Sequence, residues 1–212
     1  MKILCLPYNY QRQETAQITL PDVQYAGKPL YPPQGQPIIV KPDTAYLNNN
    51  KPFFIPHHTT LVAAKAQMAL RIGKMGRNID ERFALRYING IGTAVDIVAQ
   101  NLLLQCEQQR APWSMATGFD GSTPVSGFIE DITEADNSEV VMRINDAEKQ
   151  RFTTSSLLLG AAQVVTYISR FFTLHTGDII LTGSPCEQIY LNINDVIDVT
   201  LNDTPMMHFR IK

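Results

Sequence analysis

The apolar run from Leu61 to Lys74, LVAAKAQMALRIGK, constrains this chain more than any other stretch. Its composition has strand character, and in a strand residues two apart point to the same face. Lys65 and Gln67 should therefore share one face of the strand. The opposite face then carries Ala64, Ala66 and Met68. We expect a long strand with a cation and an amide on one side.

A single carboxylate, Asp96, lies inside the next long apolar stretch, TAVDIVAQNLLL. Apolar residues recur with helical spacing between positions 93 and 109, and Pro112 ends the pattern. The pattern predicts a helix, or the approach to one, around Asp96. Lys65, Gln67 and Asp96 supply one cation, one amide and one carboxylate, but this trio alone does not define a chemistry.

The chain has 212 residues, of which 44% are hydrophobic and 18% charged, which suits one globular domain with a sizeable core. Prolines at positions 21, 29, 32, 33 and 37 disfavour a central helix or strand near the N-terminus. We therefore predict a first strand over Met1–Leu6 and an irregular arm over residues 15–36. Residues 1–36 together form an N-terminal arm or small subdomain, part of the same fold unit as the main domain over residues 37–212.

The formal net charge of −2 and the scattered cationic residues give no reason to expect nucleic acid or an anionic membrane as partner. The three cysteines, Cys5, Cys106 and Cys186, are widely spaced and indicate free thiols rather than disulfides or a zinc site. No stretch approaches the roughly 20 apolar residues of a membrane span. The apolar run near the N-terminus is interrupted by Pro7 and is too short for the core of a signal peptide. We expect a cytoplasmic protein.

Short strands dominate the rest of the pattern. Val140–Ile144 and Arg151–Thr153 flank Asn145-Asp146 as a hairpin, and turns at residues 194–195 and 202–203 separate strands near the C-terminus. Residues 155–174 predict a helix capped by Ser155 or Ser156, and Asn78 is a predicted cap for a shorter one. The fold class is α+β and mainly β. We find no repeat, phosphate-binding loop or Gly-x-Ser-x-Gly elbow.

Several motifs together resemble the fumarylacetoacetate hydrolase family. FFTLHTGDIILTGSP over residues 171–185 is similar to the family's closing signature, and APWSMATGFD over residues 111–120 to its "pro-trp-x-x-ala-lys-x-phe-asp" run. VKPDTA at residues 40–45, ALRIGK at residues 69–74 and the Asn-Tyr pair at residues 9–10 follow the family pattern in order. The resemblance spans nearly the whole chain and implies a mixed β-sheet roll or sandwich with a few flanking helices.

The resemblance also implies a chemistry. Family members hold Mg²⁺ or Mn²⁺ with a Glu-x-Glu pair and an Asp, oxygen ligands that suit hard cations. The metal polarises an oxo acid while a carbon–carbon bond breaks, or while the substrate isomerises. In this chain the three positions are Lys65, Gln67 and Asp96, so only Asp96 keeps its type. A charged Lys has no lone pair for a metal, and we therefore expect no metal cofactor unless other ligands rebuild the site for Mg or Mn.

Other family positions have changed as well. The His and Glu that act as base in active members correspond to Gln13 and Ala16, and the family Lys corresponds to Thr117. We leave the catalytic residues unassigned. The predicted ligand pocket consists of Lys65, Gln67, Asp96, Thr117, Asp120, Thr182, Gly183 and Ser184.

Two functional interpretations remain open. The first is a pseudoenzyme: a family homodimer that binds a small oxo acid or dicarboxylate, or serves as a partner subunit, without turnover. The second is an active hydrolase, decarboxylase or isomerase on β-diketo or oxo acids with displaced ligands. Ligands for the second would come from His57, His58, Asp120, Glu130 or Asp131.

Three hypotheses for the role of the Lys65 side chain remain open. Its ammonium could take the place of the metal and pair with Asp96, a buried ion pair whose disruption costs about 3–5 kcal/mol. It could instead extend to solvent without pairing. A third reading, an imine-forming amine, would require a desolvated lysine.

Overall fold

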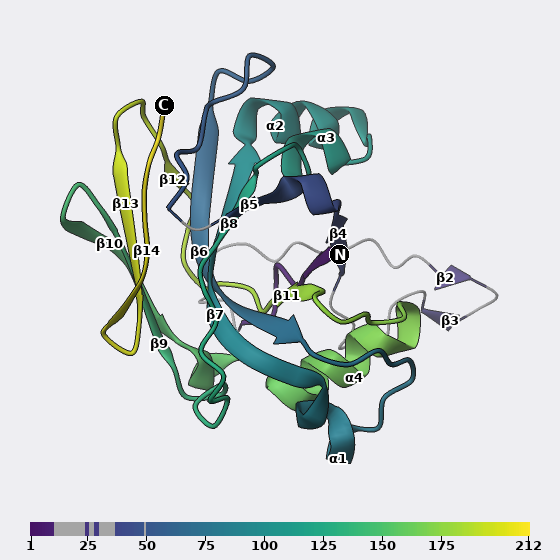
Figure 1. The fold of residues 1–212 in the computed structure, drawn as a ribbon. Coiled ribbons are helices and arrows are strands. Elements are labelled where there is room, and N and C mark those ends of the chain that lie inside the picture. The colour runs from purple at the N-terminus through teal and green to yellow at the C-terminus, as the bar shows by residue number, and fades with distance from the viewer. Residues whose placement is uncertain (11–23, 26–27, 30–36, 49) are drawn as a thin grey trace.

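A computed structural model of the protein describes residues 1–10, 24–25, 28–29, 37–48 and 50–212. Most of the predicted arm, including Gln13 and Ala16, therefore lies outside the described residues. Within the described part, the chain folds into a curled mixed sheet, a second antiparallel sheet packed against it and a few helices at its ends (Figure 1). This confirms the predicted mainly-β fold class.

The curled sheet has eight strands among the described residues, in the order β4-β1-β11-β6-β7-β8-β5, with β12 paired to β6. Its strands are β1 (Ile3–Cys5), β4 (Ile39–Lys41), β5 (Tyr46–Asn48), β6 (Val62–Ile72), β7 (Ile88–Ala99), β8 (Thr123–Val125), β11 (Ile179–Leu181) and β12 (Ile189–Tyr190). The two end strands, β4 and β5, are joined by the short 3-10 helix η1 (Asp43–Ala45), so one segment of chain contributes both ends of the sheet.

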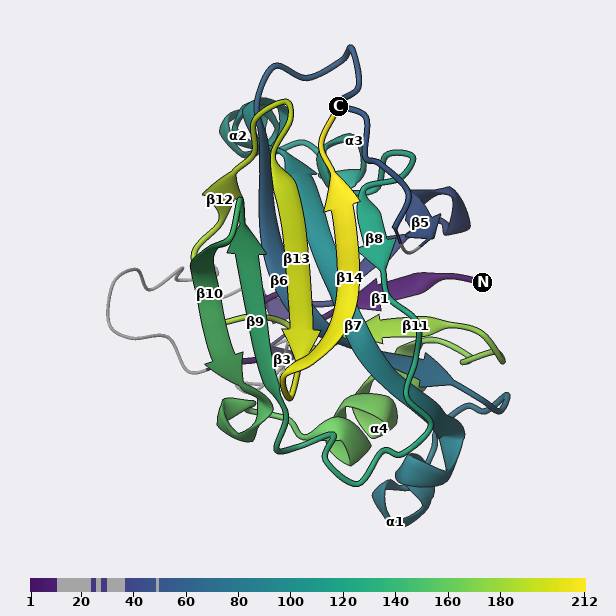
Figure 2. The same ribbon diagram turned by 60° about the vertical axis from the view of Figure 1, so that its left-hand side comes forward.

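The second sheet has the order β10-β9-β13-β14 and lies across β6 and β7 (Figure 2). Its strands are β9 (Glu139–Ile144), β10 (Ala147–Thr153), β13 (Val196–Leu201) and β14 (Thr204–Arg210). Asn145 and Asp146 turn the β9–β10 hairpin with positive φ at both residues, as a tight hairpin requires. The predicted hairpin and the turns at 194–195 and 202–203 are thereby confirmed.

The helices lie at opposite ends of the curled sheet, with α2 (Gln100–Gln109) and α3 (Ser114–Thr117) at one end and α1 (Glu81–Ala84) and α4 (Ala161–Phe171) at the other (Figure 1). The remaining short elements are η2 (Leu85–Tyr87), η3 (Thr154–Ser156), β2 (Gln24–Tyr25) and β3 (Lys28–Pro29). No helix in the described ranges is long and apolar enough to cross a membrane.

Three sequence predictions about these elements are wrong. Residues 93–99 continue β7, and helix α2 begins only at Gln100, because both faces of β7 are covered and a buried strand reads as a continuous apolar run. Gly160 rather than Ser155 or Ser156 precedes α4. Asp80 rather than Asn78 caps α1, and its carboxylate accepts a hydrogen bond from the Arg82 amide at 3.1 Å.

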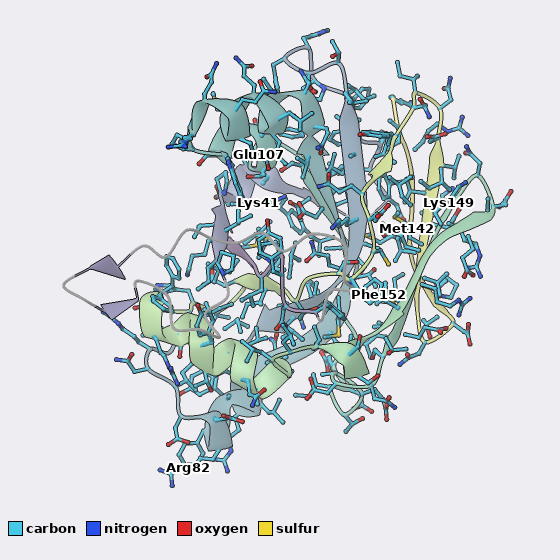
Figure 3. The ribbon with its side chains drawn as sticks, turned by 180° about the vertical axis from the view of Figure 1, so that it is seen from behind. Lys41, Arg82, Glu107, Met142, Lys149 and Phe152 are labelled. Carbon is cyan, nitrogen blue, oxygen red and sulfur yellow. The ribbon has the colours of Figure 1, made fainter. Side chains whose placement is uncertain are left out.

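Strand β6 separates two cores, as its alternation predicts. Ala64, Ala66 and Met68 face the second sheet and belong to the larger core between the sheets, together with Met142 and Phe152. Lys41 lies on the opposite side of β6 from Met142 and Phe152 (Figure 3). On that concave side a smaller apolar core includes Cys5, Ala69, Ala94 and Leu181. The polar residues of β6 therefore face the hollow of the curled sheet.

Candidate functional site

The register between β6 and β7 brings the predicted trio together. Lys65 lies directly opposite Asp96, and Gln67 lies opposite Ala94, on antiparallel neighbouring strands. Residues directly opposite on one face of such a pair have Cβ atoms about 5 Å apart. All three side chains therefore start from one patch on the concave face, although Gln67 precedes Asp96 by 29 positions in the chain and Lys65 lies two positions further away.

The cation that pairs with Asp96 is Lys41. Its Nζ lies 2.5 Å from Asp96 Oδ1 and donates a second hydrogen bond to Thr123 Oγ1 at 2.9 Å. The Lys41 side chain is 1% exposed and that of Asp96 18% exposed, so the ion pair is largely withdrawn from water. The sequence-based hypothesis gave this role to Lys65, whereas the ion pair in the structure is made by Lys41, which β4 brings to the concave face from the edge of the sheet.

Gln67 forms a hydrogen bond with the other carboxylate oxygen of Asp96. Its Nε2 donates to Asp96 Oδ2 at 3.1 Å, while its Oε1 accepts a hydrogen bond from the Gly183 amide at 2.9 Å. Gln67 is 2% exposed, and both ends of its amide form hydrogen bonds within the protein. The result is one continuous network from Thr123 through Lys41, Asp96 and Gln67 to the Gly183 backbone.

The turn after β11 completes this side of the site. The Thr182 amide and hydroxyl both donate to the Met68 carbonyl, at 3.1 and 3.3 Å. Gly183 has φ of +94°, and a Cβ there would lie 2.4 Å from the Leu6 carbonyl oxygen, so only glycine fits. Ser184 is 7% exposed, and its Oγ accepts from the Cys186 amide at 3.3 Å. The turn is held tightly against β6.

Thr117 and Asp120 of the predicted pocket make no hydrogen bond to this network among the described residues. Thr117 is buried, but its hydroxyl donates to the Trp113 carbonyl within α3, and its side chain lines a separate groove beside Ile38, Val40 and Trp113. Asp120 is exposed. The displaced ligands considered above, His57, His58, Glu130 and Asp131, are exposed as well.

Lys41 and Thr123 are the site residues that sequence reasoning did not identify. The only signal for Lys41 was its position in the Lys-Pro motif at residues 41–42. Its buried charge could not be inferred, because a lysine beside a proline at a strand end is ordinarily solvated.

Lys65 is half-buried on the same face. Burial raises the pKa of the nearby Cys186 thiol, and the positive charge of Lys65 is among the groups that oppose this rise. The Lys65 side chain therefore lies within electrostatic reach of the 184–186 segment.

The donor set does not fit a hard divalent cation. Asp96 is the one carboxylate at the three positions, and its two oxygens already accept from Lys41 and Gln67. Lys65 has no lone pair while charged, and the Gln67 oxygen faces the Gly183 amide. In the described part of the chain, no group of three or more His, Cys, Asp or Glu side chains could hold a metal ion.

Fold and site together define a class: mixed-sheet proteins with a polar site on the concave face of a curled sheet, closed by a Thr-Gly-Ser-Pro turn. The family model described as fumarylacetoacetate (FAA) hydrolase C-terminal matches residues 2–212. The chain therefore belongs to the fumarylacetoacetate hydrolase family.

Individual relatives agree with this assignment. The chain is 30% identical over 177 residues to oxaloacetate tautomerase FAHD1, mitochondrial, of Bos taurus, which covers 82% of this chain and 80% of the relative. It is 28% identical over 204 residues to oxaloacetate tautomerase YcgM of Escherichia coli (strain K12), covering 95% and 88% of the two chains.

Solved structures show the same fold. A fumarylacetoacetate hydrolase family protein of Yersinia pestis CO92 superposes with a TM-score of 0.84 at 28% identity, over 100% of this chain and 92% of the other. Fumarylpyruvate hydrolase of Pseudomonas aeruginosa, solved with Mn²⁺ and pyruvate, gives a TM-score of 0.85 over 100% and 89% of the two chains. Its 20% identity supports a common fold only.

Proposed function

We propose that this protein is a family member without metal-dependent catalysis, a pseudoenzyme that keeps the fold and the capacity to bind a small oxo acid or dicarboxylate. The observation that carries the proposal is that both oxygens of Asp96 are hydrogen-bonded within the protein, to Lys41 and to Gln67. A metal would have to displace an ammonium and an amide from a largely buried carboxylate, and it would meet a second cation at Lys65.

The consequence is chemical. Carbon–carbon cleavage of an oxo acid needs an electrophile that stabilises the enolate, the part a divalent ion plays in metal-assisted catalysis. In this network the Lys41 ammonium is 1% exposed and bonded to Asp96 and Thr123, so it cannot reach a substrate oxygen without breaking the network. Within the described residues, the network around Asp96 stabilises the site but provides no group for this step.

The alternative is an active enzyme on oxo acids, and the names of the relatives favour it, since two of them are oxaloacetate tautomerases. A keto–enol interconversion needs only proton transfer, so loss of a metal alone does not exclude it. The two proposals differ in whether oxaloacetate tautomerises faster in the presence of the protein.

The test is a calorimetric titration of Mn²⁺ into metal-stripped protein, with and without oxalate, which mimics an enolate. We expect no binding up to millimolar Mn²⁺ and no acceleration of oxaloacetate tautomerisation followed by the absorbance of the enol. Tight Mn²⁺ binding that oxalate enhances, or measurable turnover, would refute the pseudoenzyme proposal.

A double variant tests whether the site geometry survives. Lys65→Glu with Gln67→Glu restores the carboxylates of the family pattern and should bind Mn²⁺ if the geometry is retained. The matched control is Lys149→Glu with Gln108→Glu, which makes the same charge change at two exposed positions. We also propose a homodimer, to be checked by light scattering on the same samples.

A further inference from the structure

One end of the molecule, around α1 and the last turn of α4, gathers exposed cationic side chains. The amides of Asn78 and Ile79 donate to the Ser169 carbonyl and hydroxyl, at 3.0 and 2.9 Å. Gly76 and Leu174 exchange two further backbone hydrogen bonds, at 3.0 and 2.8 Å. These contacts hold the segment before α1 against α4. They bring together five exposed cations, which we name the basic surface: Lys74, Arg77, Arg82, Arg86 and Arg170.

The basic surface also carries apolar side chains in contact with water. Phe83, Leu85 and Phe171 are exposed. The guanidinium carbons of Arg82 and Arg86 lie 4.7 and 5.0 Å from the centre of the Phe83 ring. These cation–π contacts restrain two long side chains before any partner binds, which lowers the entropy lost on binding. Arginine and aromatic residues are also enriched in protein–protein interfaces.

The carboxylates near the basic surface neutralise only part of its charge. Asp80 and Glu81 are the acidic residues of α1 and its cap. Asp80 Oδ1 lies 3.3 Å from Arg82 Nε, but both side chains are more than half exposed, so water screens this pair. Within the described part of the chain, the other four cations of the basic surface make no ion pair with a carboxylate. This end therefore carries an excess of positive charge, although the whole chain has a formal charge of −2.

A segment of opposite charge connects β8 to β9. Residues 129–137, IEDITEADN, form this acidic segment and contain no cation. Its four carboxylates are all exposed, and among the described residues none of them pairs with a cation: Glu130, Asp131, Glu134 and Asp136. Ile129 exchanges two backbone hydrogen bonds with Ile91 of β7, at 2.8 and 2.9 Å. The acidic segment therefore has a fixed starting point beside the curled sheet.

Helix α4 links the acidic segment to the basic surface. The Asp136 carboxylate accepts from the amide of Ala161, the first residue of α4, at 2.7 Å, and Arg170 lies in the last turn. A helix of 11 residues is about 16 Å long, so the two charged regions are neighbours. Figures 1 and 2 show the chain between β8 and β9 at the same end of the molecule as α1 and α4.

Neighbouring regions of opposite charge make a surface complementary to a copy of itself. In a two-fold dimer the same patch is used by both subunits, so each positive region meets the negative region of the other copy. Nucleic acid or an anionic membrane would instead bring further negative charge against the acidic segment. The charge pattern therefore favours a second copy of the chain as the partner.

We propose that two copies of this chain associate through this end, with the acidic segment of each lying on the basic surface of the other. The inference rests on the homodimer proposed above and assigns its interface. The arginines bind the carboxylates of the partner through paired hydrogen bonds, and Phe83, Leu85 and Ile129 lose contact with water. Two symmetric contacts of this kind suit an interface of standard size, about 800 Å² on each copy.

The experiment is a charge swap followed by sedimentation velocity on the full chain. Arg82→Glu with Arg86→Glu reverses the basic surface, and Glu130→Arg with Glu134→Arg reverses the acidic segment. Each variant alone places like charges in both contacts, so its dimer dissociation constant should rise about 100-fold or more. An equimolar mixture of the two variants should form a heterodimer within about tenfold of the parent's dissociation constant, because every contact then joins opposite charges.

The matched control is Lys51→Glu with Lys149→Glu, which makes the same charge change as the first variant at exposed positions. Lys149 and Arg82 lie on opposite sides of the molecule (Figure 3), and the control should dimerise like the parent. Circular dichroism spectra that match the parent's show that each variant is folded.

The outcomes separate this interface from the other proposals. Dimers of both variants as tight as the parent's, or a mixture of folded variants that stays monomeric, would overturn the interface and leave the homodimer standing. A monomeric parent chain would remove both. None of these results changes the Mn²⁺ titration, whose outcome alone decides the pseudoenzyme proposal.

Discussion

Removing the charge of Lys41 should destabilise the protein strongly. In Lys41→Met the side chain keeps its length and apolar stem, but Asp96 loses its ion pair and Thr123 loses its donor. Removing one partner of a buried ion pair lowers the free energy of unfolding by about 3–5 kcal/mol. Asp96 is 18% exposed and keeps the Gln67 hydrogen bond, so we expect the lower end, about 3 kcal/mol.

The measurement is urea unfolding followed by circular dichroism and by the fluorescence of Trp113, the single tryptophan. Coincident transitions from the two signals would justify a two-state treatment. In a chain of this size the same loss lowers the thermal midpoint by about 6–12 °C. EDTA in every sample keeps metal from contributing.

A double-mutant cycle isolates the ion pair. Asp96→Asn should also destabilise, because it leaves the Lys41 ammonium buried without its counter-charge. Lys41→Met combined with Asp96→Asn should recover about 2 kcal/mol relative to the sum of the single changes. Lys149→Met, at an exposed position, should change stability by less than about 0.5 kcal/mol. A cost for Lys41→Met no larger than this control would refute the reasoning.

Three further predictions concern other parts of the molecule. Gly183→Ala should cost about 2 kcal/mol or more, because φ is +94° and the new Cβ would meet the Leu6 carbonyl, and unchanged urea unfolding would contradict this. Burial raises the pKa of the Cys5 thiol to about 12 from 9.0, so the native state holds its proton where the unfolded chain releases it. Stability should therefore be complete below pH 9 and fall by up to about 1.4 kcal/mol per pH unit between pH 9 and 12, and Cys5→Ser should remove this part of the pH dependence of urea unfolding. Asp146→Gly should stabilise the β9–β10 hairpin by about 0.5 kcal/mol, since Asp146 has φ of +64° in the turn, and a lower thermal midpoint would argue against it.

The sequence predicted the elements whose signal is local. Alternation in residues 61–74 identified β6 and the face that carries Lys65 and Gln67, because side-chain direction in a strand depends only on position along it. Asn145-Asp146 identified a hairpin for a similar reason, since few residues tolerate positive φ at both turn positions. Local periodicity failed at residues 93–99, where a strand covered on both faces has an apolar pattern that a buried helix segment shares.

The partners of the charged groups were decided by the tertiary structure alone. Sequence order and family resemblance placed Lys65 and Asp96 in one site, and strand register confirms that they lie opposite each other. Which lysine pairs with Asp96 depends on the route of β4, a three-residue edge strand that brings Lys41 into the concave face 55 positions before Asp96. An ion pair depends on which charged groups the fold brings into contact. Lys41 and Asp96 are 55 positions apart, and no periodic pattern in the sequence links positions at that separation.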